Sequence, residues 1–370
     1  MKSFAFVFIP LLVAGFMFPD ENCGSPAPHT TRIDGPYVLY KEDKVFVNYI
    51  VDNHGTKQVQ ADSFLLAQKD AVTLQVATDE AGKTFPVKLK VQLDNEKPDY
   101  SGVSKMLILS DIEGNFAAFK KLLLAGGVID SSLNWTFGNG HLVLTGDFVD
   151  RGQMVTEVLW LIYSLEDKAK AAGGYVHYIL GNHEIMNMSG DLRYVHPKYM
   201  ESAGLLNKGF TSLYGDSSEL GRWLRTKNVM EKINDVLFVH GGISSLVNLL
   251  ELSTTKLNKL VRPYYADSIM NFNNEQLDIL YSDFGPFWYR GYYTSNIHGH
   301  INTIDSTMRQ YKVKKIATGH TIVADTISVL LNGKVINTDV HHASGHSEAL
   351  LMQDGKYFRV KPDGEKLQVL

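Results

Sequence analysis

The chain has 370 residues, of which 44% are hydrophobic and 21% charged, and this balance excludes a disordered chain and a collagen-like repeat. Its formal net charge is -4, so no global positive field would recruit nucleic acid or an anionic membrane. The single cysteine, Cys23, excludes an intramolecular disulfide and any multi-cysteine metal site. The thirteen histidines are then the abundant nitrogen ligands of this chain.

The first 23 residues have the pattern of a signal peptide. Lys2 is the only charge before Asp20, and an apolar run of about 15 residues follows it. That run suits a secretory signal and is short for a membrane span. We predict a signal peptide over residues 1–23 and a periplasmic or secreted protein. The alternative is an uncleaved anchor, the one case in which we expect membrane contact.

Residues 24–102 read as a linker followed by a small β-rich extension. Residues 45–51 are strand-like, and residues 84–93 alternate apolar and polar side chains from Val87 onward. Turn signals separate these segments at residues 53–55 and 79–82. Nothing in this extension suggests catalysis, so packing or partner contact is its expected role.

Residues 103–370 have the alternation of an α/β domain. Short, continuously apolar runs indicate strands that are buried on both faces, and helical periodicity follows the first two of them. The expected strands lie at residues 106–109, 141–144, 175–180, 236–239 and 315–318, and the expected helices at residues 116–124 and 155–170. An Asn332-Gly333 turn predicts a hairpin over residues 328–337.

Each of the five apolar strands is followed by polar residues of a similar kind. The candidate ligands after these strands are Asp111 and Glu113, Asp147, Asn182, His240, and His320. Because ligands bind beyond the carboxyl ends of strands in open α/β sheets, we expect these side chains to share one cleft. Any one of them alone would more often be a helix cap or a turn. Carboxylates, an amide oxygen and two imidazoles together are ligands for manganese, iron or zinc.

The motifs resemble a known enzyme family. Asp111-x-Glu113, Gly146-Asp147-x-x-Asp150-Arg151-Gly152, Gly181-Asn182-His183-Glu184, His240-Gly241-Gly242 and Gly319-His320 are similar to those of the calcineurin-like metallophosphoesterases. The Asp-Arg-Gly sequence resembles the phosphoprotein phosphatase branch, and residues 285–291 resemble its bacterial, Shewanella-like type. The resemblance covers about residues 104–355. It implies an α/β fold, a four-layer sandwich of mixed sheets flanked by helices.

The resemblance also implies a dinuclear centre for two divalent or trivalent ions, with Mn²⁺, Fe or Zn²⁺ as candidates. Asp111, position 113 and Asp147 would hold the first ion. The bridging Asp147 would share the second ion with Asn182, His240 and His320. A metal-bound hydroxide would attack phosphorus in line, and two ions would stabilise the entering and leaving oxygens together.

Four further residues have catalytic roles implied by the resemblance. His183 would act as the general acid and Asp150 would orient it, while Arg151 and Arg290 would bind the phosphoryl oxygens. The chemistry of these side chains suits the roles, since imidazole donates protons near pH 7 and guanidinium matches phosphate bidentately. The alternative for Arg290 is a structural cation stacked among the aromatic residues around it.

Glu113 departs from the family pattern, which usually has histidine at this position. Three interpretations stay open: Glu113 ligates the first metal, it forms hydrogen bonds only, or the site is impaired. We favour ligation, which adds one negative charge around the metals and shifts preference toward harder ions such as Mn²⁺, Mg²⁺ or Fe³⁺.

Two segments outside these motifs allow more than one interpretation. Residues 185–235 contain a helical pattern at 219–225, which we interpret as a packed helix with exposed arginines; a cap over the cleft is the alternative. His341 and His342 are expected in an exposed loop, with an outer-shell or third-metal role as the alternative.

The leading functional prediction is a metal-dependent phosphomonoesterase resembling the phosphoprotein phosphatases. Its substrate would be a phosphoprotein or a small phosphate ester, and no nucleic-acid partner is expected. A phosphodiesterase or nucleotide pyrophosphatase of the same superfamily is the second interpretation. The third is a non-catalytic surface module that binds metal or phosphate, which Glu113 favours and the intact His183, Asp150 and Arg151 oppose.

Overall fold

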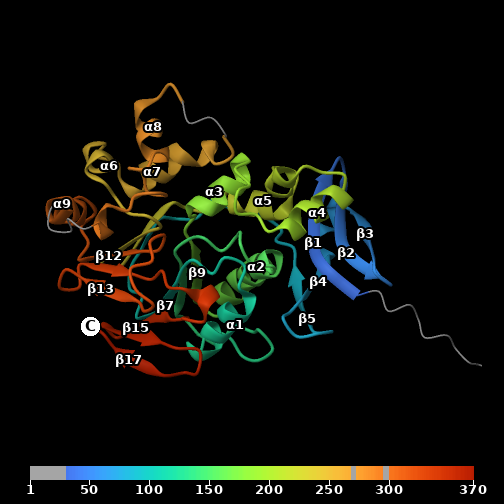
Figure 1. The fold of residues 1–370 in the computed structure, drawn as a ribbon, viewed down its shortest axis with the longest axis horizontal. Helices are drawn as coiled ribbons and strands as arrows, with labels where there is room; N and C mark the ends of the chain where they lie inside the picture. The colour runs from blue at the N-terminus through green and yellow to red at the C-terminus, as the bar shows by residue number, and fades with distance from the viewer. Residues whose placement is uncertain (1–30, 268–271, 295–299) are drawn as a thin grey trace, which may run out of the picture.

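A computed structural model describes residues 31–267, 272–294 and 300–370 (Figure 1). The predicted signal peptide and Cys23 lie outside the described residues. The strands are β1 (Thr31–Lys41), β2 (Lys44–Asn53), β3 (Thr56–Leu65), β4 (Thr73–Ala77), β5 (Thr84–Lys88), β6 (Asp99–Tyr100), β7 (Lys105–Leu109), β8 (His141–Leu144), β9 (Tyr175–Tyr178), β10 (Met230–Ile233), β11 (Val236–Val239), β12 (Lys315–Thr318), β13 (Ser328–Leu330), β14 (Val335–Asn337), β15 (Ala349–Gln353), β16 (Lys356–Val360) and β17 (Lys366–Gln368). The α-helices are α1 (Phe116–Ala125), α2 (Val155–Ala171), α3 (Asn182–Ser189), α4 (Pro197–Leu205), α5 (Glu219–Leu224), α6 (Ser245–Leu249), α7 (Thr254–Val261), α8 (Glu275–Tyr281) and α9 (Ile301–Tyr311).

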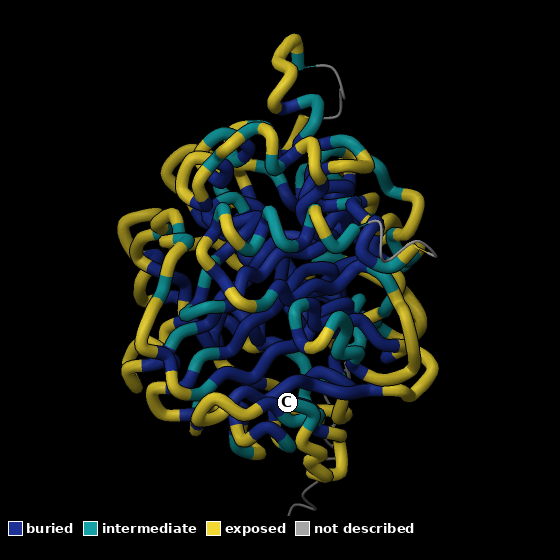
Figure 2. Tube along the Cα trace, turned by 90° about the vertical axis from the view of Figure 1, so that its left-hand side faces the viewer, coloured by how far each residue is buried: buried dark blue, intermediate teal, exposed yellow. Residues whose placement is uncertain are grey.

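Two six-stranded mixed sheets form the centre of the molecule. One has the strand order β17-β16-β15-β7-β8-β9, in which β7, β8 and β9 are parallel. The other has the order β13-β14-β12-β11-β10-β6, in which β11, β12 and β14 are parallel. Side chains from both sheets, including Met106, Ile108, Val143 and Phe238, form one buried cluster. This confirms the mixed-sheet sandwich, whose buried interior is visible along the chain (Figure 2).

Strands β7, β8, β11 and β12 show why continuous apolar runs predicted them. Successive side chains of a strand point to opposite faces, so Met106 and Ile108 face the cluster between the sheets, whereas Leu107 and Leu109 join the larger core. The hairpin prediction is also confirmed, since β13 pairs antiparallel with β14.

The strand expected over residues 84–93 is wrong beyond Lys88, where β5 ends. The chain leaves the sheet there because Lys90 is held by the core of the domain. Its backbone N–H donates to the Tyr163 hydroxyl at 2.7 Å, and its Nζ lies 2.7 Å from Asp167 Oδ1. A buried lysine with two such partners overrides the alternating pattern.

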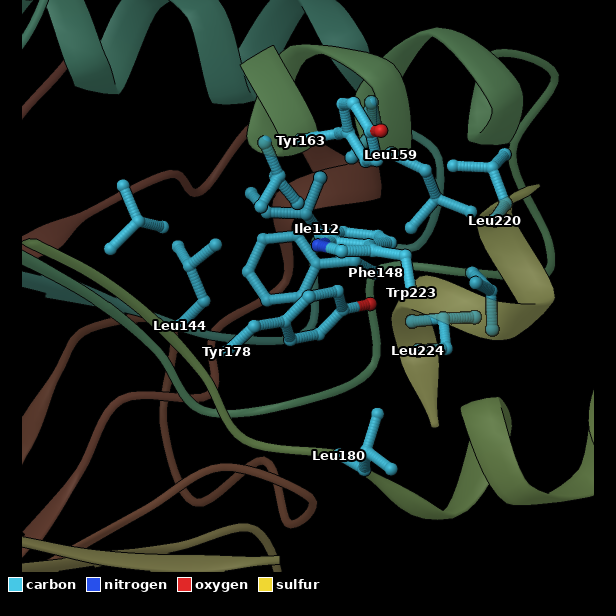
Figure 3. Packing of buried hydrophobic residues seen from close by; sticks show 14 of the residues in the cluster. Ile112, Leu144, Phe148, Leu159, Tyr163, Tyr178, Leu180, Leu220, Trp223 and Leu224 are labelled. Carbon is cyan, nitrogen blue, oxygen red and sulfur yellow. The ribbon is translucent and has the colours of Figure 1, made fainter. Parts of the chain in front are cut away.

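Aromatic side chains pack among aliphatic ones between α2, α5 and the parallel strands (Figure 3). The Trp223 ring lies 5.7 Å from the Tyr163 ring and 5.4 Å from the Tyr178 ring, and Tyr178 contacts Phe148 in an edge-to-face arrangement at 5.4 Å. Such pairs contribute about 0.5–1.5 kcal/mol each beyond the area that they bury. Because Phe148 is adjacent to Asp147 in the loop after β8, this packing fixes the loop that carries Asp147.

The N-terminal extension packs against α2 and α5. Its sheets are β1-β2-β3 and β4-β5, both antiparallel. Trp160 of α2 donates its indole N–H to the Pro36 carbonyl at 2.9 Å, and the buried Glu219 of α5 accepts hydrogen bonds from both Tyr40 and Tyr163. Lys69 of the extension adds an ion pair to Glu219 at 3.3 Å. The extension therefore shares a continuous core with the domain, while the predicted boundaries at residues 23 and 102 stay predictions.

Helix α5 confirms the packed-helix interpretation of the segment before β10. Leu220, Trp223 and Leu224 are buried, while Arg222 is exposed and lies 4.8 Å from the centre of the Tyr40 ring. The expectation of an exposed side chain is wrong for Arg225, which is half-buried because it donates to the Tyr214 and Gly221 carbonyls. Within the described ranges, none of the helices combines the length and apolar character needed to cross a membrane.

Candidate active site

The predicted metal ligands are brought together from two sheets. Asp111 follows β7, Asp147 follows β8, and Asn182 opens α3 after β9, whereas His240 follows β11 and His320 follows β12. The carboxyl ends of the parallel strands of both sheets thus meet at one edge of the sandwich. The rule that ligands bind beyond the carboxyl ends of parallel strands therefore holds here for two sheets together. The order of the strands in these sheets depends on contacts between residues distant in sequence, which hydrophobic periodicity does not predict.

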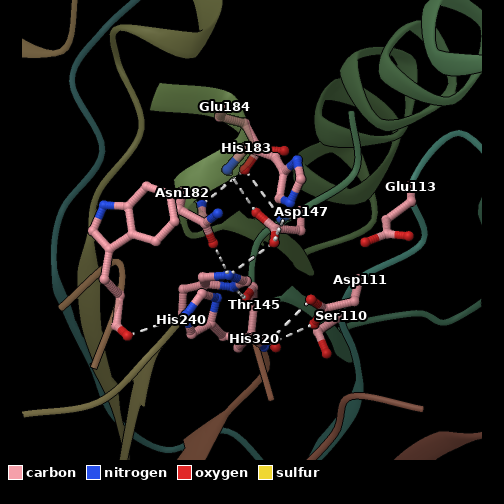
Figure 4. Close-up of polar contacts among 12 residues, drawn as sticks. Ser110, Asp111, Glu113, Thr145, Asp147, Asn182, His183, Glu184, His240 and His320 are labelled. Atoms are coloured by element: carbon pink, nitrogen blue, oxygen red, sulfur yellow. Dashed lines mark hydrogen bonds and ion pairs between the residues drawn. The ribbon is translucent and has the colours of Figure 1, made fainter. Parts of the chain in front are cut away.

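Four of these side chains point at a common centre (Figure 4). His240 Nε2 lies 3.0 Å from both Asp147 Oδ2 and Asn182 Oδ1. Ligand atoms of Asp147, His240 and His320 all lie within 4.8 Å of one another, and all three residues are buried. The His240 Nδ1 atom donates to the Thr145 carbonyl at 2.7 Å, so Nε2 is free to bind a metal. This donor set fits an ion held by Asp147, Asn182, His240 and His320.

The loops that carry these residues adopt an unusual backbone conformation. Asp111, Asp147, Asp150 and His320 have φ values of 51°, 59°, 72° and 67°, in the left-handed region that residues other than glycine rarely adopt. Each costs on the order of 1–3 kcal/mol and persists only where its surroundings impose it. Close approach explains the neighbouring Gly181, because a Cβ atom there would lie 2.1 Å from Asp147 Oδ1.

Burial and mutual charge perturb the titration of the site. Burial raises the pKa of Asp111 to about 7. Burial opposes the ionisation of Asp147 as well, but the His240 and His183 charges outweigh it and lower the pKa of Asp147. Burial would lower the pKa of His240, yet the Asp147 carboxylate raises it to about 10. A buried cluster of groups with strongly shifted pKa values is typical of functional sites. A bound cation would replace the protons that these residues share and would balance the charge of the carboxylates.

Glu113 lies apart from the ligands that converge on the common centre (Figure 4). Its carboxylate forms an ion pair with Arg151 Nη1. Asp111, by contrast, lies beside the centre, since its Oδ2 accepts the His320 backbone N–H at 3.1 Å. Asp111 therefore lies beside the ligand cluster, whereas the Glu113 carboxylate pairs with Arg151, as in the interpretation in which Glu113 forms polar contacts and does not ligate a metal. In the part of the chain that the structure describes, Asp147, His240 and His320 form the one acid and histidine group close enough to hold an ion.

His183 is paired with Asp150 as expected. His183 Nδ1 lies 2.7 Å from Asp150 Oδ2, and its Nε2 lies 3.8 Å from Asp147 Oδ2. Burial would lower the pKa of His183, but the carboxylates of Asp147 and Asp150 raise it. Because Nδ1 faces Asp150, the protonated ring presents Nε2–H toward the metal-binding side of the site.

The two arginines line the same cavity as the ligands. This cavity has a volume of about 780 Å³, and Asp111, Asp147, His183 and His320 line it together with Arg151 and Arg290. Arg290 donates to the His320 carbonyl at 2.6 Å and to Thr321 Oγ1 at 3.0 Å, which fixes its position at the rim. The structure therefore combines a partly enclosed site of mixed polarity with two guanidinium groups.

A family model described as "Calcineurin-like phosphoesterase" matches residues 104–324. The chain belongs to this family. "Shewanella-like protein phosphatase 2" of Arabidopsis thaliana is 26% identical over 303 residues, which cover 69% of this chain and 74% of that protein. An uncharacterised Schizosaccharomyces pombe protein is 30% identical over 252 residues, 65% of this chain and 73% of that protein.

A solved structure of a cold-active protein-tyrosine phosphatase from a psychrophilic Shewanella species is also similar. It is 36% identical, with a TM-score of 0.82, over 91% of this chain and 99% of that one. The alignment is longer than the phosphoesterase domain alone, so it includes most of the β-rich extension. These relatives support the Shewanella-like phosphatase branch, and this protein is a phosphatase-type enzyme of that family.

The structure adds positioning residues that motif reasoning did not single out. Glu184 is buried, and its carboxylate accepts the backbone N–H groups of Asp147, Phe148 and Gly181 at 2.8–3.0 Å. Asn187 donates to Asp150 Oδ1 at 2.8 Å and thereby holds the partner of His183. Two features of the sequence could have identified these residues: a glutamate at the third position of α3, and an asparagine one helical turn after His183.

The loop after β14 contributes two buried residues to the catalytic cavity. Asp339 and His342 both line it, and burial together with the Asp111 charge raises the pKa of Asp339. The expectation of an exposed loop holds for His341 but is wrong for His342, whose Nδ1 lies 3.1 Å from Ser347 Oγ. No pattern in the sequence separates these two neighbouring histidines.

Proposed function

We propose that this protein is a metal-dependent phosphomonoesterase that acts as a phosphoprotein phosphatase-like hydrolase. The observation that carries the proposal is the His183–Asp150 pair at 2.7 Å beside a buried ligand cluster in a cavity lined by two arginines. A module that only binds metal or phosphate needs no imidazole held by a carboxylate. The same observation therefore argues against a non-catalytic role.

Metal ions held by Asp147, Asn182, His240 and His320, with Asp111 beside them, would supply Lewis-acid activation of water. Arg151 and Arg290 bind the non-bridging oxygens of the phosphoryl group and orient it in the cavity. His183 donates the proton on Nε2 to the departing oxygen, and Asp150 holds the ring by Nδ1. Two guanidinium groups suit the dianion of a monoester better than the monoanion of a diester.

The proposal is tested by hydrolysis of para-nitrophenyl phosphate after metal removal and reloading with Mn²⁺, iron or Zn²⁺. We expect metal-dependent turnover of this substrate that Asp147→Asn abolishes or strongly reduces. His183→Asn should abolish or strongly reduce hydrolysis of an alkyl phosphate, whose leaving group needs a proton. Faster hydrolysis of bis(para-nitrophenyl) phosphate would favour the phosphodiesterase instead. No turnover with any of these metals would leave the binding module as the better hypothesis.

The proposal extends to the natural substrate and to the cellular location of the protein. Similarity to a protein-tyrosine phosphatase supports a phosphoprotein substrate, including phosphotyrosine. The apolar residues after Lys2 support export to the periplasm or the medium. Fractionation of cells that produce the full chain, with N-terminal sequencing of the mature protein, tests export and cleavage near residue 23.

A further inference from the structure

A second cavity lies between the N-terminal extension and the phosphoesterase domain. Its volume is about 440 Å³. Residues of β1, β2, α2 and α4 line it, and they include Arg32, Asp34, Glu157, Lys198 and Glu201. Gln153 and Met154 line both this cavity and the catalytic one, so the two are neighbours separated by these side chains. A peptide that leaves the catalytic cavity over Gln153 and Met154 reaches the second cavity within a few residues, since an extended chain advances about 3.3 Å per residue.

Glu157 is the acid of this cavity that lacks a close cationic partner. It is 3% exposed, and its Oε2 atom has no hydrogen-bond partner. The other two acids are compensated: Asp34 accepts from the Tyr37 and Ser202 hydroxyls and lies 3.3 Å from Lys198 Nζ, while Glu201 pairs with Lys57 at 2.5 Å.

The cations of the cavity are engaged elsewhere. Lys198 is near enough to favour the ionised form of Glu157, but it donates to the Gln153 carbonyl at 2.6 Å and pairs with Asp34. Arg32 stacks on the Tyr49 ring at 4.1 Å. Burial raises the pKa of Glu157 to about 7, so its charge is poorly compensated in the free protein. A buried, unpaired carboxyl group is costly and gains most from a cation brought by a ligand.

We propose that this cavity is a specificity subsite that takes one lysine or arginine side chain of a phosphopeptide substrate, with Glu157 as the acceptor. The proposal rests on the proposed phosphatase function and deepens it. It gives the β-rich extension a role, since β1 and β2 form one wall of the subsite. The occupant has one positive charge because a single carboxyl group is uncompensated and Arg32 and Lys198 repel a second cation.

The test compares phosphopeptides in which one residue is arginine or citrulline, which has the same shape and no charge. Phosphotyrosine and phosphoserine series in an alanine background carry this residue at each position from three before to three after the phosphorylated one. We expect the arginine-to-citrulline ratio of kcat/KM to reach about tenfold or more at one or two adjacent positions, as for a hydrogen bond to a charged group. Elsewhere we expect a ratio near one, with the preference expressed mainly in KM.

Two variants connect that preference to the cavity. Glu157→Gln should reduce the ratio to about one, whereas Glu201→Gln, which removes an acid already paired with Lys57, should keep it. If Glu157→Gln unfolds, Ala77→Lys serves instead, because residue 77 lines the cavity and a lysine there would occupy the site from within. Thermal unfolding of each variant checks that it is folded.

The possible outcomes separate the two proposals. Normal hydrolysis of para-nitrophenyl phosphate with no arginine preference at any position would overturn the subsite and leave the phosphatase standing. A preference that Glu157→Gln and Ala77→Lys both preserve would overturn it as well. Absence of turnover with any substrate would overturn the phosphatase and the subsite together.

Discussion

The pair of His183 and Asp150 leads to a prediction that is specific to the leaving group. In Asp150→Asn, the new side chain must still satisfy Asn187, whose Nδ2 donates to position 150 at 2.8 Å and to the His183 carbonyl at 3.1 Å. The carbonyl of the new amide therefore faces Asn187, and its NH₂ group faces His183. His183 Nδ1 must then accept a hydrogen bond, which disfavours the protonated ring and lowers the pKa of His183.

The magnitude follows from the bond that is lost. A charge-assisted hydrogen bond contributes about 1.5–3 kcal/mol, which corresponds to one to two pKa units of His183. Because Asp147 and Asp150 raise the pKa of His183 in the native protein, protonated His183 is present at low pH and lost as the pH rises through that value. Asp150→Asn should move this loss of activity to lower pH. It should also remove most of the general-acid effect, worth about 10²–10⁴-fold.

The assay measures kcat for a series of phosphate monoesters whose leaving groups differ in basicity. An alkyl phosphate should lose about 10³-fold in Asp150→Asn, whereas para-nitrophenyl phosphate should lose less than about tenfold, because its leaving group departs without a proton. Adding Asn187→Leu to Asp150→Asn frees the amide to turn its carbonyl toward His183, and about tenfold of the alkyl phosphate activity should return. An equal loss with every leaving group would refute the role of His183 as the general acid.

Three further predictions concern stability, pH and metal. Glu184→Gln should lower the free energy of unfolding by about 2–3 kcal/mol in urea titrations with a chelator present, because at least one buried backbone N–H loses its charged acceptor. Burial raises the pKa of Glu231 to about 8, so the folded state binds more protons than the unfolded state between about pH 4.5 and 8 and stability falls as the pH rises through that range. Glu231→Gln should flatten that decline in thermal unfolding measured at several pH values, and an unchanged slope would contradict it. Glu113→His places a nitrogen ligand beside the site and should broaden metal use toward Zn²⁺ in competitive metal-binding titrations. Unchanged metal use would mean that position 113 serves only the contact with Arg151.

Local patterns were sufficient for the strands of the central sandwich that carry the candidate ligands, whereas β6 and β10 were not predicted. Three of the ligand-carrying strands, β8, β11 and β12, have the predicted bounds, because a strand buried on both faces is apolar throughout and ends where polar ligands begin. The extension was harder to predict. Strand β3 is exposed along nearly its whole length, so its sequence shows no alternation of apolar and polar side chains. The strand forms because it pairs with β2, and hydrophobic periodicity does not predict that pairing.

The candidate site shows a similar division. Motif spacing identified the residues that converge, since each follows a strand end. The contact between Glu113 and Arg151 could not be predicted from the sequence, because it depends on left-handed backbone turns at both residues. The position of Glu157 in the second cavity could not be predicted either, because strands more than a hundred residues earlier in the chain form part of the cavity wall.

The shared hydrogen bonds of Glu219 have a consequence for how this enzyme can change in evolution. One buried carboxylate receives Tyr40 and Lys69 from the extension and Tyr163 from α2. Loss of the first two would leave that charge inside the protein with too few partners, at a cost of several kcal/mol. Deletion of the extension, or its exchange for that of a relative, should therefore destabilise the domain. Substitutions at this contact between the extension and the domain must arise together on both sides. A chain that begins at residue 103 should unfold at a markedly lower temperature than the intact one.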